Sequence, residues 1–499
     1  MIKIISIMSE QMVKNQNDTD VDKSHQQHDT DSKVTDTPHQ IAVALDAISL
    51  GSNECQIRSP IFKLINDCWE LIFDWLSLKE LHSFGRTCKH FQRLTGEYFK
   101  WKYQNVNCSL NNHNYRNVDC GVNDSNVSFE YIAGNELVGF IPFIQKLSLG
   151  NLKLDASFRY VVENIKSIKS MEILNARFLD LDLKLMKNSL SSVEVVKFVN
   201  TYNLDGTFFE TFLKLCVKLK RLTIDTNAGN TWLLHKYPTL QYLKLTHCDT
   251  LVNGELTTFF QQNSNVRSFS TTEKILMQHR DSFIANNIEL DDLTILLVDD
   301  MNEFCVVMND LYRRGVYKRL HLKTATTECL ENLPGLVTLH VDTNDYVEMP
   351  KLDGVTELVF QPHYNGPVCR MNMEEVSMNL KNLERIFTPT TNEEYMSAFI
   401  RNSAKLKEIK TDSISPHGSH GRLPNGGINV VAMNNERKKL NGAHKVTIYL
   451  EEKDYLAKDH EERDYLSIKW NHNKTDFGLI EVKRKESYEG VWDHTFGYY

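Results

Sequence analysis

The chain has 499 residues, more than a single hydrophobic core supports, so several units or a repeat array are expected. Apolar residues make up 41% of it, a share typical of folded soluble proteins. Lys and Arg total 57 against 65 Asp and Glu, which gives a formal net charge of -8. This balance argues against nucleic acid as a partner, because phosphate contacts require a concentrated basic face.

The cysteine pattern and the N-terminus bear on the compartment. The ten cysteines include no Cys-x-x-Cys pair and no zinc-type spacing with histidine, a usage typical of a reducing compartment. The apolar run from Ile2 to Met8 is too short for a signal-peptide core or a membrane span. We therefore expect a protein of the cytoplasm, the nucleus or both, with no membrane partner.

Residues 1–58 are predicted to be a disordered N-terminal tail. From about residue 9 to residue 40 the chain is rich in Gln, Asp, Ser, Thr, His and Lys, with almost no large apolar residues. Such a stretch buries too little apolar surface to offset the entropy lost on ordering.

Residues 59–103 are predicted to form a small helical module. An apolar stripe at the spacing of one helix face runs through it: Cys68, Leu71, Ile72, Trp75 and Leu76. Ser77 stops this pattern and opens a second helix, with Glu80 three residues later completing a capping box. Gly85 weakens the second helix, so we expect a break near it.

These residues and their neighbours resemble the F-box motif in order and spacing. The matching positions are Leu64, Asp67, Leu71, Ile72, Phe73, Trp75, Leu76, Ser77, Leu78, Lys79, Leu81, Thr87, Cys88, Lys89 and Phe91. F-boxes are three-helix modules that dock onto the Skp adaptor of a cullin–RING ubiquitin ligase, so the resemblance implies an adaptor and a cullin as partners. It also implies which residues supply much of the docking face: Leu64, Ile65, Cys68, Leu71, Phe73 and Leu76.

One position departs from the F-box pattern. The family usually has proline directly after the first leucine, where this chain has Ile65, so the start of the first helix is less fixed. The alternative interpretation is an ordinary helical hairpin packed on the next domain. Residues 104–140 are predicted to be a linker, because the stretch up to about residue 128 is rich in Asn and poor in apolar groups.

From residue 141 to residue 499 one pattern recurs, in which apolar residues are separated by two residues and then by one, often with Asn or Cys after them. The clearest copies begin at Leu219, Leu240 and Leu336. Weaker copies centre on Leu147, Leu174, Val196, Phe269, Leu296, Leu320, Leu358, Ile386 and Ile409. This is the leucine-rich-repeat consensus, with helical stretches such as 208–219 between the strands, so the predicted fold is an α/β leucine-rich-repeat solenoid, a horseshoe.

The C-terminal part of the predicted solenoid is less regular. Proline and glycine residues between about 413 and 441 predict an irregular insertion, after which residues 446–450 resume a strand pattern. The tail carries four aromatic residues: Trp492, Phe496, Tyr498 and Tyr499. We interpret the tail as the C-terminal cap that a solenoid needs, and a ligand-binding aromatic patch is the alternative.

Residues that flank the strand leucines are expected to point to the concave, solvent-facing side. The candidate target-binding residues there are Arg221, Tyr242, Lys244, Arg319, His321, Lys323 and His340. The run Arg319, His321 and Lys323 is basic within an acidic protein, which favours a target segment that carries negative charge, for example a phosphate. Against this, solvated strand residues are commonly charged without binding anything.

No catalytic pattern stands out, since the sequence has no phosphate-binding glycine loop, nucleophile elbow or His-Glu-x-x-His motif. The acidic residues Asp291, Asp292, Asp299 and Asp300 are interpreted as a solvated rim rather than a cation site. We therefore expect a non-catalytic substrate-recognition subunit of a Skp–cullin–F-box ubiquitin ligase, without cofactor or metal. A repeat scaffold that never meets a ligase is the first alternative, and a hydrolase or metal enzyme is the second.

Overall fold

The computed structural model divides the chain into two compact units, which are described separately. The helical unit comprises residues 1–104 and 131–144, and the sheet unit comprises residues 105–130 and 145–499. The described residues are 66–104, 107–111, 126–128, 138–150, 164–166, 168–175, 183–201, 206–226, 229–247, 251–252, 254–285, 288–298, 300–341, 348–360, 372–391, 393–414, 417–418, 421–422, 430–450 and 477–484. The predicted N-terminal tail and aromatic C-terminal cap lie outside these residues.

The helical unit contains α3 (Asn66–Phe73), α4 (Leu78–Gly85), α5 (Lys89–Lys102) and the 3-10 helix η4 (Val138–Phe143). The predicted capping box is confirmed, because the Glu80 N–H donates to the Ser77 hydroxyl while the Ser77 N–H donates to the Glu80 carboxylate at 2.9 Å. The expected break is confirmed as well, since α4 ends at Gly85. A Cβ atom at Gly85 would lie 2.5 Å from the Thr95 hydroxyl, so a glycine there lets α4 and α5 pack closely.

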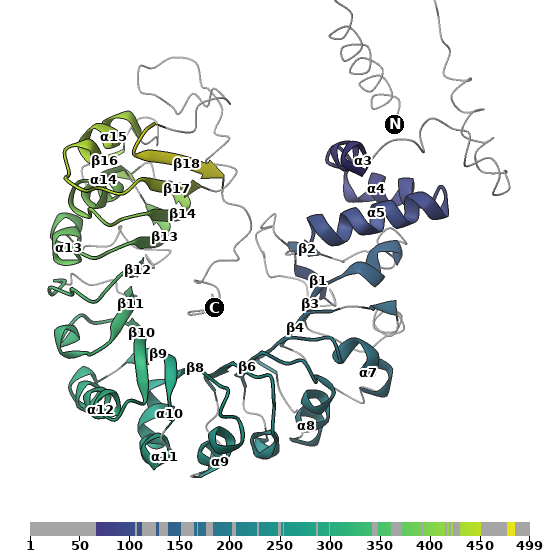
Figure 1. Cartoon of the computed structure of the whole chain (residues 1–499), viewed down its shortest axis with the longest axis horizontal. Coiled ribbons are helices and arrows are strands. Elements are labelled where there is room, and N and C mark those ends of the chain that lie inside the picture. Colours follow the sequence, from purple (N-terminus) through teal and green to yellow (C-terminus); the bar gives the residue numbers. More distant parts are fainter. Residues whose placement is uncertain are drawn as a thin grey trace, which may run out of the picture. The chain divides into compact units, whose positions relative to one another are not determined.

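The sheet unit is built on one open sheet of sixteen strands, in the order β18-β17-β14-β13-β12-β11-β10-β9-β8-β7-β6-β5-β4-β3-β1-β2 among the described residues (Figure 1). Neighbouring strands pair in parallel along this sheet. A separate antiparallel pair consists of β15 (His417–Gly418) and β16 (Gly421–Arg422). The bounds are β1 (Asn107–Asn111), β2 (Asn126–Ser128), β3 (Lys146–Gly150), β4 (Ser170–Leu174), β5 (Val195–Val199), β6 (Arg221–Asp225), β7 (Tyr242–Leu245), β8 (Ser268–Thr272), β9 (Leu290–Val298), β10 (Tyr317–Thr324), β11 (Leu336–Val341), β12 (Glu357–Phe360), β13 (Arg385–Thr391), β14 (Glu408–Ile414), β17 (Val446–Leu450) and β18 (Ile480–Arg484).

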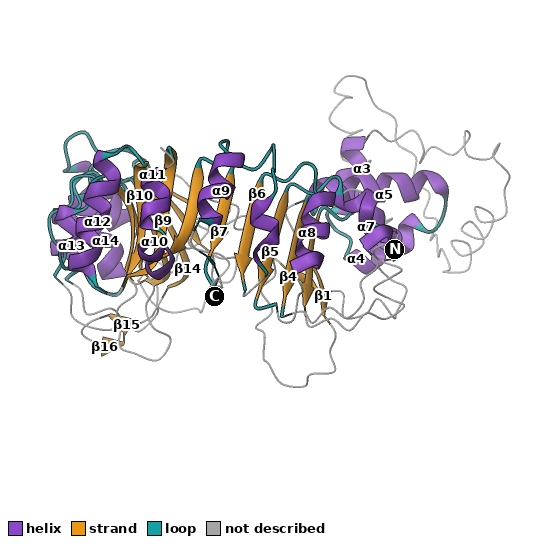
Figure 2. Cartoon of the chain, turned by 90° about the horizontal axis from the view of Figure 1, so that it is seen from below, coloured by secondary structure: helices purple, strands orange, loops and turns teal. Residues whose placement is uncertain are grey.

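Helices follow most of the strands and cover one face of this sheet, while the strands line the other, inner face (Figures 1 and 2). They are α7 (Leu183–Leu190), α8 (Gly206–Leu215), η5 (Asn230–Leu234), α9 (Glu255–Gln262), α10 (Glu273–Gln278), α11 (Arg280–Ala285), α12 (Met301–Arg313), η6 (Leu330–Asn332), α13 (Met373–Asn379), α14 (Glu393–Asn402) and α15 (Val430–Lys438). This open parallel arrangement is consistent with a solenoid-like repeat.

The core lies between the helices and the sheet, and every second residue of a strand points into it. Leu222 and Ile224 of β6 are fully buried, as are Leu243 and Leu245 of β7. Each repeat centre predicted from the sequence lies in one of the parallel strands. Leu174 is one position beyond the core-facing residue of its strand, Ile173, whereas Leu296 is itself buried, beside Ile295 in the sequence.

Part of the predicted linker 104–140 belongs to the sheet instead. Strand β1 pairs in parallel with β3 on one side and with β2 on the other. Cys108 in β1 is buried, and this burial raises the pKa of its thiol to about 12. These strands could not be predicted from the Asn-rich sequence, because they form by backbone hydrogen bonding next to β3 and not by an alternating apolar pattern.

The predicted irregular insertion between about 413 and 441 is also partly regular. Helix α15 (Val430–Lys438) lies within it, and Val430 and Met433 are buried. The glycine and proline residues that suggested irregularity precede this helix, so the prediction fails for its second half. Among the described residues of the whole chain, no helix is long and apolar enough to cross a membrane.

Candidate functional site

An aromatic cluster forms the interior of the helical unit. The Trp69 ring lies 5.7 Å from that of Phe73 and 5.1 Å from that of Phe91, measured between centroids. Phe84 packs on Phe91 at 4.4 Å, and Tyr98 packs on Phe73 at 5.2 Å. These contacts join α3, α4 and α5 around one small core, as aromatic side chains with large buried areas do in short domains.

The opposite face of α3 leaves large apolar side chains exposed. Leu71 is 66% exposed and Trp75, four residues later in the turn that ends the helix, is 79% exposed. Cys68 is half-buried one turn before Leu71. Residues three or four apart lie on one helix face, so the three side chains form an apolar strip facing away from the aromatic cluster. On α5, Trp101 is 56% exposed.

The turn that carries Trp75 is anchored by its neighbour Asp74. The Tyr98 hydroxyl donates a 2.6 Å hydrogen bond to the Asp74 carboxylate, and Lys102 forms an ion pair with it. Burial acts to raise the pKa of Asp74, but the hydrogen bonds from Lys102 and Tyr98 outweigh it and hold that pKa below its ordinary value. The anchor fixes the end of α3 against α5.

The residues predicted for adaptor docking divide among several environments. Leu64 and Ile65 lie outside the described residues. Leu71 is exposed, whereas Cys68 and Leu76 are half-buried. Phe73 is 1% exposed and is corrected to a core residue, because it lies two positions from both Leu71 and Trp75 and therefore on the opposite side of the helix. Trp75 is not among the docking residues that the resemblance implies, although its place in the apolar stripe indicates it.

Comparison with known families assigns the helical part of the chain. Residues 61–103 match the family model of the F-box domain. This F-box match spans α3, α4 and α5 and agrees with the module predicted over 59–103. F-box proteins are generally non-catalytic, and F-box domains typically bind a Skp adaptor. No curated protein matches the chain.

The second candidate surface is the inner face of the sheet unit, where one residue per strand lies in register. We define the inner row as these residues: Glu172, Lys197, Thr223, Lys244, Ser270, Thr294, His321, Thr338 and Glu357. Adjacent members are about 4.8 Å apart along the row, as strand spacing requires. The row therefore places cations, hydroxyls and carboxylates from distant parts of the sequence side by side.

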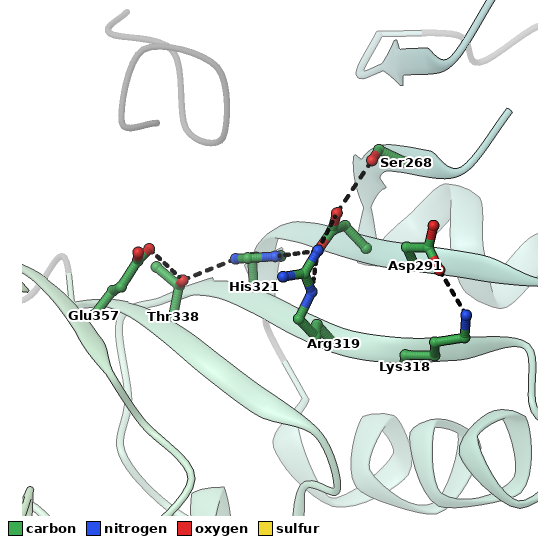
Figure 3. A network of polar contacts seen from close by, with 8 residues as sticks. Ser268, Asp291, Lys318, Arg319, His321, Thr338 and Glu357 are labelled. Atoms are coloured by element: carbon green, nitrogen blue, oxygen red, sulfur yellow. Dashed lines mark hydrogen bonds and ion pairs between the residues drawn. The ribbon is translucent and has the colours of Figure 1, made fainter. Parts of the chain in front are cut away.

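A chain of hydrogen bonds runs through the inner row around Asp292 (Figure 3). The Asp292 carboxylate forms an ion pair with the Arg319 guanidinium, in which Nε lies 2.8 Å from Oδ1. The same carboxylate oxygen lies 3.1 Å from Nε2 of His321. The Thr338 hydroxyl lies 2.8 Å from Nδ1 of His321 and donates to the Glu357 carboxylate at 2.9 Å. Because the Thr338 hydroxyl donates its proton to Glu357, both ring nitrogens of His321 face oxygen atoms that can accept a hydrogen bond.

The network determines the pKa of its central carboxylate. Burial acts to raise the pKa of Asp292, but the hydrogen bond and charge of His321, together with Arg319, outweigh it and lower that pKa. At the far end, Arg385 forms an ion pair with Glu357 at 2.9 Å. Arg319 and His321 are therefore balanced by a carboxylate, and the predicted basic run does not form a purely positive patch.

The other predicted target-binding residues also lie on the inner face, but fewer are solvent-exposed than expected. Lys244, His321 and His340 are 7%, 9% and 5% exposed. Arg221 stacks over the Tyr242 ring at 5.1 Å, and Lys323 is half-buried. The prediction that these positions face open solvent is thus corrected for three of them.

The acidic residues interpreted as a solvated rim have specific partners instead. Asp291 pairs with Lys318 at 2.7 Å, and Asp292 is the centre of the network. Asp300 caps α12 by accepting the N–H groups of Asn302 and Glu303. Asp299 lies outside the described residues, and the described part of the chain contains no group of three or more metal-ligating side chains.

Replacing Asp292 with Asn is expected to lower the free energy of unfolding at pH 7 by about 1–3 kcal/mol, because Arg319, His321 and the Ser268 hydroxyl lose a charged acceptor. The Asp292 pKa is lowered by folding, so its stabilisation is present above the ordinary aspartate pKa and is lost as pH falls through the folded-state value. The difference between wild type and variant should therefore shrink below about pH 4. Urea denaturation at several pH values measures it.

Asp291→Asn is the matched control for this prediction. Asp291 and its partner Lys318 have side chains that are 43% and 68% exposed, and such surface pairs contribute little to stability. An equal loss of stability in both variants would contradict a special role for the Asp292 network.

Proposed function

We propose that this chain is the substrate-recognition subunit of a Skp–cullin–F-box ubiquitin ligase. The observation that carries the proposal is the F-box match over residues 61–103, combined with an exposed apolar strip on the first helix of that module. Leu71 and Trp75 are the exposed residues of this strip, and no described partner in the chain covers them. Exposed apolar surfaces of this kind are commonly covered by a permanent protein partner. The Skp adaptor is the partner proposed for it.

We further propose that the sheet unit is a leucine-rich-repeat solenoid. The proposal is supported by apolar residues at the consensus spacing that enter the core of successive parallel strands, as Leu222 and Ile224 do in β6. Helices on one face leave the inner face for recognition, as extended repeat surfaces do in binding proteins. A target protein is proposed to bind there.

No covalent chemistry on this chain is needed for the proposed role. The adaptor and cullin would bring the charged ubiquitin carrier, and the sheet unit would hold the target, so lysines of the target react at a raised effective concentration. We place this activity in the cytoplasm or the nucleus, where the free cysteines of the chain stay reduced.

Affinity capture of the full chain from cells, with and without proteasome inhibition, tests the proposal. The Skp adaptor and a cullin should be recovered in both conditions, and a target should accumulate only when its degradation is blocked. Recovery of other proteins without adaptor or cullin would favour the alternative of a repeat scaffold outside any ligase. Val217→Asp, at an exposed position of the sheet unit, serves as a control that should leave adaptor recovery unchanged.

A further inference from the structure

A second row of residues lies on the inner face of the sheet unit, two positions after the inner row on each strand. Because side chains alternate across a strand, these residues point to the same side as the inner row. From β9 to β14 the second row is Leu296, Lys323, His340, Val359, Phe387 and Lys410, and Tyr449 and Lys483 continue it to β18. The second row is therefore one continuous strip that reaches the last strand of the described sheet.

Three members of the second row are apolar and as buried as core residues. Leu296, Val359 and Phe387 are 2%, 5% and 1% exposed and form a hydrophobic cluster. They lie on the inner face, whereas the described helices cover the opposite face of the sheet (Figures 1 and 2). A sheet face that meets only water commonly carries polar residues at such positions. An apolar cluster there is typical of a surface against which another segment packs.

Residues 485–499 follow β18 in the sequence and carry the aromatic residues Trp492 and Phe496. Along the sheet, β13 is three strand spacings from β18, or about 14 Å, and β9 is seven, or about 34 Å. At about 3.4 Å per residue, an extended chain beyond β18 covers about 27 Å up to Trp492 and about 41 Å up to Phe496. Trp492 can therefore reach the cluster residues on β12 and β13, and Phe496 can reach the one on β9.

Charge favours the same match. Residues 485–499 contain three acidic side chains, Glu486, Glu489 and Asp493, against one basic side chain, Lys485. The charged members of the second row are lysines, on β10, β14 and β18. Those on β14 and β18 also lie near a carboxylate of their own strand, at 3.9 Å and 3.4 Å. The aromatic contacts are therefore expected to contribute more than the charges.

We propose that residues 485–499 bind along the second row, with Trp492 on Val359 and Phe387 and with Phe496 near Leu296, and that they compete with the target for the inner face. The competition rests on the proposed target-binding role of that face, whereas the contact itself does not. A tethered segment needs only a weak intrinsic affinity, because the linkage holds it at an effective concentration of about 1 mM. A target must then displace this segment in order to bind.

A synthetic peptide of residues 485–499 tests the contact, with the full chain as its receptor. In one receptor Trp492 and Phe496 are both replaced by Asp, so that its own segment leaves the second row and the peptide should bind there. The wild-type receptor, whose tethered segment occupies the row, should bind the peptide about 10-fold more weakly or not at all. Fluorescence anisotropy of a labelled peptide measures both affinities. A peptide with the same two Asp substitutions should bind neither receptor.

Val359→Thr locates the bound peptide. In the receptor with the two Asp substitutions, the threonine adds a hydroxyl that the peptide must desolvate, so the peptide affinity should fall about 10-fold. Val195→Thr is the matched control and should have no effect, since Val195 is half-buried on the same face of β5, seven strands away. Threonine suits a strand, and equal melting temperatures of the two variants show that both are folded.

Two results contradict the contact. Equal affinity of the wild-type and Asp-substituted receptors for the peptide, or unchanged affinity of a folded Val359→Thr chain, overturns the proposal. A concentration-dependent dimer of the wild type, which the Asp substitutions abolish, would assign the segment to a second copy of the chain and overturn binding within one chain.

Target and adaptor capture on the same chains separate this inference from the proposed ligase role. The chain with the two Asp substitutions should capture about 10-fold more target than the wild type, because no tethered segment competes. Adaptor capture should be the same for both. Unchanged target capture would overturn the competition. Failure of adaptor capture would contradict the ligase role and leave the peptide measurements standing.

Discussion

A chain in which Leu71 and Trp75 are both replaced by Asp is expected to bind the Skp adaptor about 1,000-fold more weakly than the wild type, or not at all. Central apolar anchors of an interface each contribute about 2 kcal/mol or more, and each 1.4 kcal/mol is about a tenfold change in affinity. Both side chains are largely exposed, so the substitutions should leave the helical core of Trp69, Phe73 and Phe91 intact. Calorimetry with purified adaptor measures the loss.

The matched control places the same charges elsewhere. Val217 and Val306 are 60% and 70% exposed on the sheet unit, so replacing both with Asp adds two carboxylates at comparable apolar positions. This control should bind the adaptor as the wild type does. Unchanged affinity in the Leu71 and Trp75 variant, with its helical content preserved, would show that the strip is not the docking face.

Arg437→Met is expected to destabilise the C-terminal part of the sheet unit by about 3–5 kcal/mol, because removing a buried charged partner leaves its acceptors unpaired. The Arg437 side chain is fully buried in α15, and its guanidinium donates to backbone carbonyls rather than to a carboxylate. These carbonyls belong to Ile400, Ser403, Ala404, Leu406 and His444, at distances of 2.7–3.1 Å.

The position of these carbonyls explains the size of the expected effect. They lie at the end of α14, where helix carbonyls have no partner within the helix, and before β14 and β17. Burial lowers the pKa of Arg437 to about 10, so the guanidinium stays charged at pH 7 and complements the helix end. Hydrogen exchange should therefore accelerate first in β14, β17 and β18, since repeat units unfold from weakened neighbours.

Lys438→Met is the control for this prediction, because Lys438 is the exposed neighbour of Arg437 and carries the same charge. It should change neither the free energy of unfolding nor hydrogen exchange by a measurable amount. A similar small effect for Arg437→Met would contradict its role as a backbone clamp.

The parallel strands were predictable because each must bury apolar residues at fixed spacing. Leu222 and Ile224, or Leu243 and Leu245, reveal their strands by the need to fill the core between sheet and helices. Strand β1 was not predictable in the same way, since its order comes from backbone pairing with β3 rather than from apolar pattern. The first helices were predictable from the same period and from the Ser77 capping box.

The details of the candidate surfaces were less accessible from the sequence. The apolar stripe identified α3 and contained Trp75, which faces outward, whereas Phe73, which faces the core, was expected on the docking face only from the F-box resemblance. Asp292 and His321 are 29 residues apart, and only the register of β9 and β10 brings them together. The charge balance of the inner face therefore follows from the strand register and could not be predicted from the sequence alone.

Association of the purified full chain with purified Skp adaptor is the most direct measurement of the central claim. A stable one-to-one complex in size-exclusion chromatography, which then recruits the cullin, is the result that the proposed role predicts. A monomeric, folded chain that fails to bind the adaptor at micromolar concentrations would contradict it, whatever else the inner face of the sheet unit binds.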